Sequence, residues 1–164
     1  MKTLILMRHG KSSWEDLDLE DHERPLLKKG IKRTMKISRF LAEKKIKPDI
    51  IISSIAVRAY DTAGLIAKNL EYPAEKIVMD ESLYFSGMQA IEDVICKLPN
   101  SSQSAMIVGH NPDMTRFANQ FLEEKIDYLP TSAVMGLRFH CSHWREIMLS
   151  TREILFVMYP RMLE

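Results

Sequence analysis

With 164 residues, 46% of them hydrophobic, and a formal net charge of +1, the chain is long enough for one domain with a substantial core. The near-zero charge provides no global basic field for nucleic acid and no acidic tail, so anion selectivity must come from local clusters. No segment approaches the roughly 20 apolar residues that span a bilayer, and the apolar N-terminal run is too short for a signal peptide. We therefore expect a cytoplasmic protein with one domain over residues 1–164 and no membrane or nucleic-acid partner.

Short apolar runs alternate with longer amphipathic segments along most of the chain. The apolar runs predict strands at residues 2–8, 50–52, 77–79 and 105–108. The amphipathic segments predict helices at 26–45, 56–70, 88–98 and 112–122. In the last third, residues 133–139 and 146–149 are expected to pair around a turn at 140–144, followed by a strand at 154–158. These elements predict an α/β protein, a three-layer α/β/α sandwich whose central sheet is mostly parallel with an antiparallel addition.

Two local features constrain this outline. Residues 11–25 form a polar segment rich in aspartate and glutamate, and its length favours a functional or self-packed loop. Cys96 and Cys141 lie in unrelated segments without the spacing of metal ligands. We expect both to be reduced structural thiols.

Histidine and arginine side chains follow three of the predicted strands at their carboxyl ends. Arg8 and His9 end the first strand, Arg58 follows the second, and His110 follows the fourth. Each of the two histidines is next to a glycine. In an open α/β sheet, ligands bind in the crevice beyond the carboxyl ends of the strands. Histidine can act as a nucleophile near neutral pH, and arginine binds phosphate oxygens through two donors at once.

Each of these residues also has an ordinary structural interpretation. A lone histidine is usually solvated or hydrogen-bonded for structural reasons, and we keep that interpretation for His22, His140 and His143. Taken alone, Arg58 is typical of a helix surface and Arg8 of an ion pair at a strand end. The convergence of four such side chains at strand ends favours a functional site.

An ordered set of motifs extends over essentially the whole chain. They are Arg8 to Trp14 (Arg-His-Gly-Lys-Ser-Ser-Trp), Arg24-Pro25-Leu26, Arg58 within 53–59, Leu83-Tyr84, Gly109-His110-Asn111-Pro112, Thr131-Ser132-Ala133 and 160–163 (Pro-Arg-Met-Leu). The set resembles the histidine phosphatase superfamily, which is phosphoglycerate mutase-like in fold. Within it, the chain is similar to the small phosphohistidine phosphatases of the SixA-like group. Any single tripeptide is a weak signal, but the order of the whole set is specific.

The resemblance implies a mechanism that the residue types support independently. His9 attacks phosphorus and carries the phosphoryl group covalently, and water then hydrolyses the phosphohistidine. His110, Arg8 and Arg58 neutralise the phosphoryl oxygens in the transition state. Their positive charge makes a metal ion unnecessary, so we expect no metal and no other cofactor. One ring nitrogen of His9 must stay free, and the carbonyl of Gly10 or of a neighbour could bind the other N–H.

Three further residues are candidates for binding the substrate. Arg24 is suited to an anion site, and a salt bridge to Asp21 or Glu23 explains it equally well. Ser12 could donate a hydrogen bond to phosphate or occupy a turn. Asn111 could line the pocket or cap a helix.

The chain departs from the family pattern at two positions. The mutase and acid-phosphatase branches use a carboxylic acid to protonate an alcohol leaving group, and the candidate here is Glu81. It lies in a polar turn, where a solvated carboxylate is the alternative interpretation. Small phosphohistidine phosphatases generally lack a clear acid, which an imidazole leaving group tolerates. Leu27 stands where the group usually has Asn or Thr, so the helix start is expected to be less well capped.

We therefore predict a metal-independent phosphatase that works through phospho-His9 and acts on phosphohistidine in a protein. One alternative is a phosphatase of small phosphate monoesters, which would share the same pocket residues. Another is a non-catalytic phosphate-recognition module, which would have no use for a nucleophile between two arginines. The partner is accordingly a phosphorylated protein or a small phosphorylated substrate, and a monomer is expected.

Overall fold

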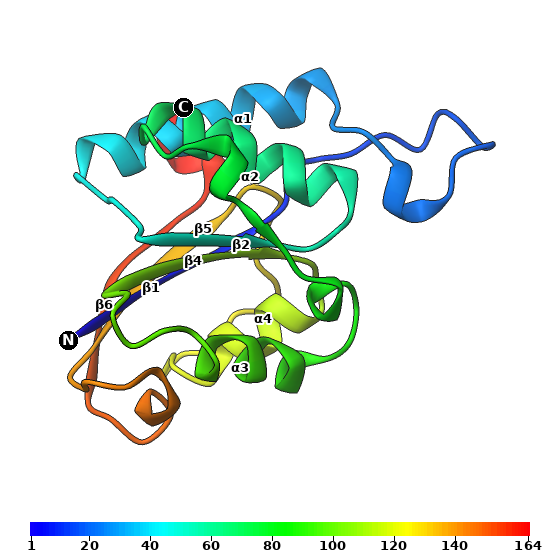
Figure 1. Ribbon diagram of the computed structural model, residues 1–164. Coiled ribbons are helices and arrows are strands. Elements are labelled where there is room, and N and C mark those ends of the chain that lie inside the picture. Colours follow the sequence, from blue (N-terminus) through cyan, green and yellow to red (C-terminus); the bar gives the residue numbers. More distant parts are fainter.

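A six-stranded sheet lies between two pairs of helices in the computed structural model, which describes residues 1–164 (Figure 1). Helices α1 (Lys28–Glu43) and α2 (Val57–Asn69) cover one face. Helices α3 (Met88–Cys96) and α4 (Asp113–Asn119) cover the other. The predicted three-layer α/β/α architecture is confirmed.

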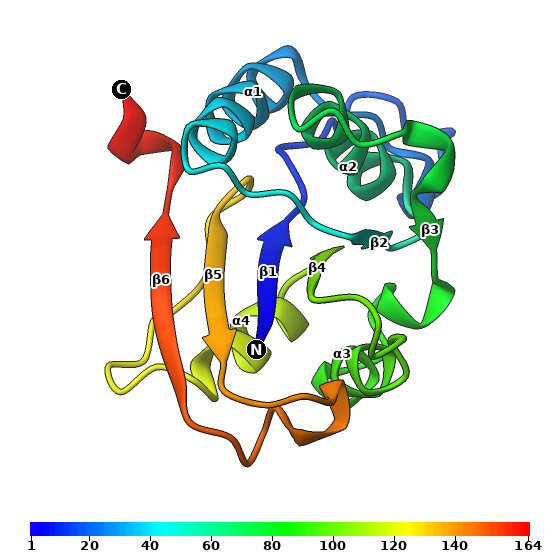
Figure 2. The ribbon, with the colours of Figure 1, turned by 60° about the vertical axis from the view of Figure 1, so that its left-hand side comes forward.

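The sheet is parallel except for one strand near an edge. Its strands are β1 (Lys2–Arg8), β2 (Ile50–Ser53), β3 (Val78–Met79), β4 (Ser104–Gly109), β5 (Val134–Phe139) and β6 (Arg152–Met158). Their order is β3-β2-β4-β1-β5-β6, from right to left in Figure 2. The first four strands pair in parallel, and β5 is antiparallel to both β1 and β6. The expected mostly parallel sheet with an antiparallel addition is therefore present.

The central strand β1 is apolar on both faces because helices cover both sides of the sheet. Leu4 and Leu6 belong to the core on the side of α3 and α4. Ile5 and Met7 belong to the core on the side of α1 and α2. All four side chains are fully buried, which explains the unbroken apolar run in the sequence. The strand ends at Arg8, which needs polar surroundings.

The expected strand at 146–149 is wrong. Residues Trp144–Glu146 form a short 3₁₀ helix, and β5 pairs instead with β6, which begins at Arg152. A strand requires residues two positions apart to share a face, whereas Ile147 is fully buried and Leu149 is 97% exposed. Trp144 and Ile147 enter the core from a turn, in which Trp144 Nε1 donates to the Ser102 carbonyl at 2.9 Å.

Segment 11–25 projects from the body of the molecule beyond the end of β1 (Figure 1). An isolated bridge between Ser12 and Leu26 closes its base, and a short 3₁₀ helix occupies Asp21–Glu23. Leu27 precedes α1 and its side chain provides no cap, as expected. The segment therefore returns to the end of β1 just before α1 begins.

Both cysteines are free thiols. None of the helices combines the length and the apolar character that crossing a bilayer requires.

Candidate active site

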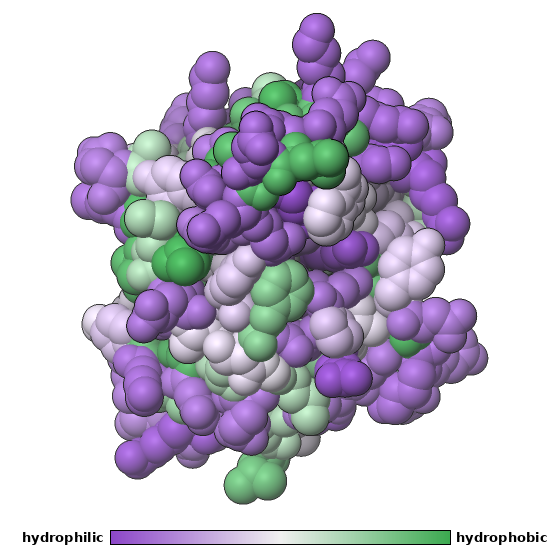
Figure 3. Space-filling view, turned by 90° about the vertical axis from the view of Figure 1, so that its right-hand side faces the viewer, coloured by the Kyte–Doolittle hydropathy of each residue, from purple (hydrophilic) through white to green (hydrophobic).

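The two predicted site histidines meet at the carboxyl ends of β1 and β4. These strands pair in parallel with Arg8 opposite Gly109, so the residues that follow, His9 and His110, lie side by side. Their ring centroids are 4.9 Å apart and the ring planes are inclined by 51°. Both side chains are buried. Figure 3 views this end of the molecule, where apolar and near-neutral side chains lie in the middle of a mostly hydrophilic face.

His9 is held as a neutral ring with one nitrogen free. Its Nδ1 lies 2.7 Å from the carbonyl oxygen of Gly10, so Nδ1 carries the proton and Nε2 keeps its lone pair. Burial, together with the positive charges of Arg58, Arg8 and Arg24, lowers the pKa of His9 to about 3, although the bond to Gly10 opposes this shift. The ring is therefore neutral at pH 7, and its Nε2 has the free lone pair that a nucleophile needs.

His110 is also neutral, and Ser54 orients it. The Nε2 atom of His110 lies 2.8 Å from Ser54 Oγ, which also accepts from the Ala56 N–H at 3.2 Å. Burial, the adjoining His9 ring and the positive charges of Arg58 and Arg8 lower the pKa of His110 to about 2, although the Asp21 carboxylate opposes this shift. A neutral ring that accepts at Nε2 from the Ser54 hydroxyl carries its proton on Nδ1, which is the tautomer that we assign to His110.

Arg8 and Arg58 are anchored at the ends of their side chains. Arg8 donates from Nη1 to the Leu129 carbonyl at 3.0 Å, and burial lowers its pKa. Arg58, in the first turn of α2, is 1% exposed. It donates from Nη1 to the Asp21 carbonyl at 2.7 Å and from Nη2 to the Asp21 carboxylate at 2.9 Å. Neither guanidinium uses its Nε in these contacts.

The buried polar side-chain atoms without a hydrogen-bond partner in the protein are few and all belong to these residues. They are Arg8 Nε, Arg58 Nε and His110 Nδ1. Buried polar groups are nearly always paired, and an unpaired one costs about 1–3 kcal/mol. Unpaired N–H groups on three side chains around a neutral histidine form what an oxyanion-binding site requires.

Arg24 joins the network from the projecting segment. It donates from Nη1 to Ser12 Oγ at 2.9 Å and pairs through Nε and Nη2 with Asp21 Oδ1 at 3.1 Å. Of the two salt-bridge partners considered, Asp21 is therefore the one that Arg24 contacts. The guanidinium also stacks on Trp14, 3.4 Å from the ring centroid. Arg24 shares the Asp21 carboxylate with Arg58, and Ser12 is linked to the pocket through Arg24.

Asp21 and Tyr84 are site residues whose part in the pocket the sequence did not reveal. The Asp21 carboxylate binds Arg58 and Arg24 and accepts a hydrogen bond from the Tyr84 hydroxyl. Burial tends to raise the pKa of Asp21, but these hydrogen bonds and charges outweigh it and lower the pKa to about 2. Asp21 is therefore ionised at neutral pH. It lies 37 positions from Arg58, so no local spacing indicated the pair.

Two other predicted site residues, Asn111 and Glu81, are not among the residues with unpaired buried donors. Asn111 donates from Nδ2 to the Leu129 carbonyl at 2.9 Å and accepts from the main chain and hydroxyl of Thr115, so both ends of its amide make local hydrogen bonds. Glu81 is exposed and lines a groove with Ile50 and residues of α3. It is not among the charges that shift the pKa of either site histidine. The structure does not bring Glu81 to the pocket.

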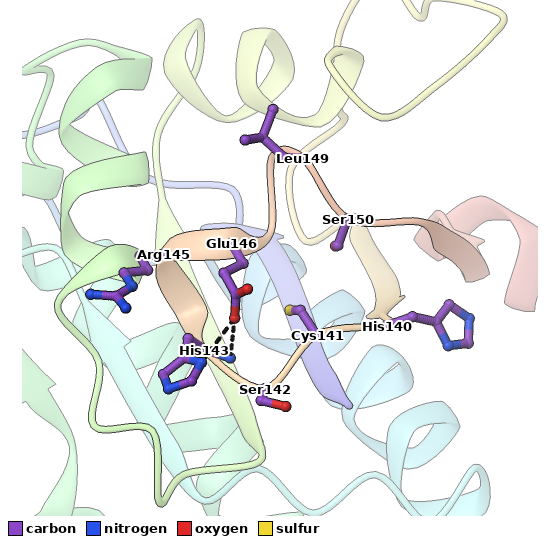
Figure 4. Close-up of a pocket in the computed structure, with 8 residues that line it drawn as sticks. All are labelled: His140, Cys141, Ser142, His143, Arg145, Glu146, Leu149 and Ser150. Carbon is purple, nitrogen blue, oxygen red and sulfur yellow. Dashed lines mark hydrogen bonds and ion pairs between the residues drawn. The ribbon is translucent and has the colours of Figure 1, made fainter.

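A hollow at the opposite end of the sheet has a different character (Figure 4). Its lining residues are His140, Cys141, Ser142, His143, Arg145, Glu146, Leu149 and Ser150. They follow β5, whose last residue pairs with Lys2 at the start of β1, far from His9. His143 Nδ1 is paired with Glu146 at 2.9 Å within its own turn, in keeping with the structural interpretation of this histidine. No unpaired buried donors converge there.

The residues that could bind a metal ion do not include the two pocket histidines. Glu20, His22 and Glu23 are the three potential ligands that lie near one another, and they are on the surface of the projecting segment. His22 is paired with Glu20 at 3.5 Å. The unpaired buried nitrogens of Arg8 and Arg58 are N–H donors, which suit an anion.

Three comparisons with known proteins are informative. Residues 4–83 match the family model described as the histidine phosphatase superfamily (branch 1). An uncharacterized chloroplastic protein of Arabidopsis thaliana is 30% identical over 153 residues, covering 88% of this chain and 70% of that protein.

Two solved structures share the fold. The protein histidine phosphatase SixA complexed with tungstate superposes with a TM-score of 0.83 at 18% identity, over 99% of each chain. A mycobacterial glucosyl-3-phosphoglycerate phosphatase superposes with a TM-score of 0.66 at 13% identity, over 94% of this chain and 97% of that chain. Both matches extend across the whole sheet and its helices.

Proposed function

This chain belongs to the histidine phosphatase superfamily, and we propose that it is a phosphohistidine phosphatase that works through a covalent phosphoryl group on His9. One observation carries the proposal: the buried polar atoms left unpaired by the fold all belong to Arg8, Arg58 and His110, whose charges or ring adjoin a neutral His9 with a free Nε2. The substrate is a phosphorylated protein, or a small phosphorylated molecule, in the cytoplasm. Arg8 and Arg58 supply the positive charge and the neutral His110 supplies a donor, so the proposal includes no metal ion.

In the first step, His9 Nε2 attacks phosphorus. A bond forms between Nε2 and phosphorus while the bond to the leaving group breaks, and the equatorial oxygens gain negative charge. Arg8 Nε, Arg58 Nε and His110 Nδ1 donate to these oxygens. The carbonyl of Gly10 keeps the proton on Nδ1 and stabilises the positive charge that the ring gains on attack.

In the second step, water attacks phosphorus on the side from which the leaving group has departed. The bond between the water oxygen and phosphorus forms as the bond between phosphorus and His9 Nε2 breaks. Both water protons leave with the product as dihydrogenphosphate, and His9 returns to its neutral form with its proton on Nδ1. The low pKa of His9, about 3, favours this neutral product over a protonated ring. The enzyme is then ready for another cycle.

The carboxylates of the site favour a substrate that needs no general acid. Asp21 is ionised at neutral pH, and Glu81 faces a different groove. An alkoxide leaving group needs a proton as it departs. The imidazole of phosphohistidine, protonated on its distal nitrogen, takes the electron pair of the P–N bond and leaves as a neutral ring. Phosphohistidine therefore fits the pocket better than a sugar phosphate does.

The direct test is detection of phospho-His9 by rapid quenching and mass spectrometry after mixing with a phosphohistidine peptide. We expect the intermediate in the wild type and neither intermediate nor turnover in His9→Ala, whereas His143→Ala in the distal hollow keeps both. A comparison of kcat/KM for the peptide and for sugar phosphates defines the substrate class. Turnover by His9→Ala, or a clear preference for a sugar phosphate that Glu81→Gln abolishes, would contradict the proposal.

A further inference from the structure

An exposed aromatic ring lies against the buried histidine of the pocket. Phe85 is 48% exposed, while its neighbour His110 is 1% exposed. The two ring centroids are 4.6 Å apart and the ring planes are inclined by only 33°. Phe85 therefore covers the outer side of His110 with one part of its ring and presents the remainder to solvent.

Neighbouring side chains fix the position of this ring. Tyr84 packs against Phe85 edge to face at 4.8 Å and against His110 at 5.3 Å. The guanidinium carbon of Arg58 lies 6.0 Å from the Phe85 centroid. Two of the groups that we assign to the phosphoryl oxygens thus adjoin the same ring. Phe85 lies at the mouth of the pocket.

The backbone at Phe85 is held in an unfavourable conformation. Its φ is +57°, in the left-handed region that bulky residues rarely adopt. Such residues cluster at active sites and ligand clamps, where the surrounding structure holds them in place. Because Phe85 is 48% exposed, burial of its side chain compensates only partly for this backbone strain.

We propose that Phe85 is a stacking platform for a planar aromatic leaving group, an imidazole or a phenol ring, so that this residue selects aromatic phosphoryl donors. The inference rests on the proposed phosphoryl transfer to His9. Attack and departure occur in line on opposite sides of phosphorus, so the leaving group lies on the side away from His9. Phe85 is an exposed aromatic ring that adjoins both His110 and Arg58, two of the groups that we assign to the phosphoryl oxygens.

The covalent step is the one already assigned to His9. The bond between phosphorus and the aromatic leaving group breaks as the bond to His9 Nε2 forms. The departing ring takes the bonding electron pair, and an imidazole protonated on its distal nitrogen leaves neutral. Stacking on Phe85 binds this ring before and during its departure, and offset aromatic pairs typically contribute about a 2- to 12-fold preference.

Two pairs of phosphoryl donors separate the aromatic ring from the bond that is broken. Phosphoimidazole and phosphoramidate both carry a P–N bond, and phenyl phosphate and a sugar phosphate both carry a P–O bond. Rapid quenching gives the rate of phospho-His9 formation from each donor and the rate of its hydrolysis. The variants are Phe85→Leu, Phe85→Asn, which suits a left-handed backbone, and Phe85→Tyr, which keeps a ring. Leu149→Ala, in the distal hollow, is the control.

We expect Phe85→Leu and Phe85→Asn to slow phospho-His9 formation from phosphoimidazole and phenyl phosphate about 2- to 12-fold. Rates with phosphoramidate and sugar phosphate, and hydrolysis of phospho-His9, should stay at wild-type values. Phe85→Tyr and Leu149→Ala should behave as the wild type. A loss confined to phosphoimidazole identifies imidazole as the ring that stacks, and a loss confined to phenyl phosphate identifies a phenol.

Two outcomes would overturn the inference in distinguishable ways. Equal losses on aromatic and non-aromatic donors, or no loss on any, in an enzyme that forms phospho-His9 would refute the platform and leave the proposed function in place. Absence of phospho-His9 in the wild type with every donor would refute the proposed function itself, and the platform with it.

Discussion

Replacing Arg58 with lysine isolates one hydrogen-bond donor of the pocket, because the positive charge stays while the guanidinium fork is lost. Arg58 binds the carbonyl of Asp21 at 2.7 Å and its carboxylate at 2.9 Å through Nη1 and Nη2. Its Nε has no partner in the protein. A lysine ammonium has three N–H groups, but its single nitrogen cannot lie at the positions of Nη1, Nη2 and Nε at once. A lysine that binds Asp21 therefore does not reproduce the donor that we assign to Arg58 Nε.

The expected loss follows from this geometry. Removing one oxyanion donor typically lowers the rate by about 10²–10³-fold. The loss should appear in both kcat and kcat/KM, since the missing contact is strongest when charge builds up in the transition state. Arg58→Ala should lose more, because it also removes the charge. It should unfold more easily, by roughly 1–3 kcal/mol, since the buried end of the side chain and the bonds to Asp21 are lost together.

The measurements are steady-state kinetics on phenyl phosphate and on a phosphohistidine peptide, with thermal unfolding as a check on folding. Arg145→Lys is the matched control, because Arg145 is an exposed arginine in the hollow at the opposite end of the sheet. An Arg58→Lys enzyme with nearly wild-type kcat and kcat/KM would show that Arg58 Nε does not hold the phosphoryl group. The assignment of the pocket donors would then be wrong.

Three further predictions concern the pH profile, the tautomer of a histidine and the backbone. The pKa of His9 is lowered from 6.5 to about 3, so the ring stays neutral as the pH falls. After correction for ionisation of the substrate, kcat/KM should show no decline near pH 6.5 and fall only on approach to pH 3. Ser54→Ala should lower kcat/KM about 2- to 10-fold, because a lost hydrogen bond contributes about 1 kcal/mol, and ¹⁵N chemical shifts should show mixed tautomers of His110. Gly30→Ala should destabilise the fold by about 1–3 kcal/mol, since its Cβ would lie 2.2 Å from a main-chain oxygen. Gly64→Ala, with open space around its Cβ, should stabilise helix α2 in the same thermal assay.

The location of the pocket could be predicted because it depends on topology rather than on detail. Parallel strands end at the same edge of a sheet, so polar residues that follow buried runs in the sequence must meet there. His9 and His110 follow two strands that proved to be direct neighbours, and Arg58 begins the helix after a third. None of this required knowledge of where individual side chains point.

The other pocket residues are positioned by contacts that a single sequence does not indicate. Asp21 reaches Arg58 only because segment 11–25 folds back against α2, and no helical or strand period relates the two residues. The left-handed backbone of Phe85 could not be predicted either, because phenylalanine does not favour positive φ. The misassigned strand at 146–149 has a similar origin: the run Ile147-Met148-Leu149 is apolar, yet burial there follows a turn and not an alternation.

Burial of the pocket produces both of the properties that the proposed chemistry needs. It makes the protonated imidazole unfavourable, which keeps His9 and His110 neutral at physiological pH. It also removes water from the N–H groups of Arg8 and Arg58, so that an oxyanion gains more from binding them than it would at the surface. A more exposed pocket would solvate these donors and protonate the nucleophile more readily. The unpaired donors therefore lower the stability of the folded chain for the same physical reason that they favour transfer of a phosphoryl group.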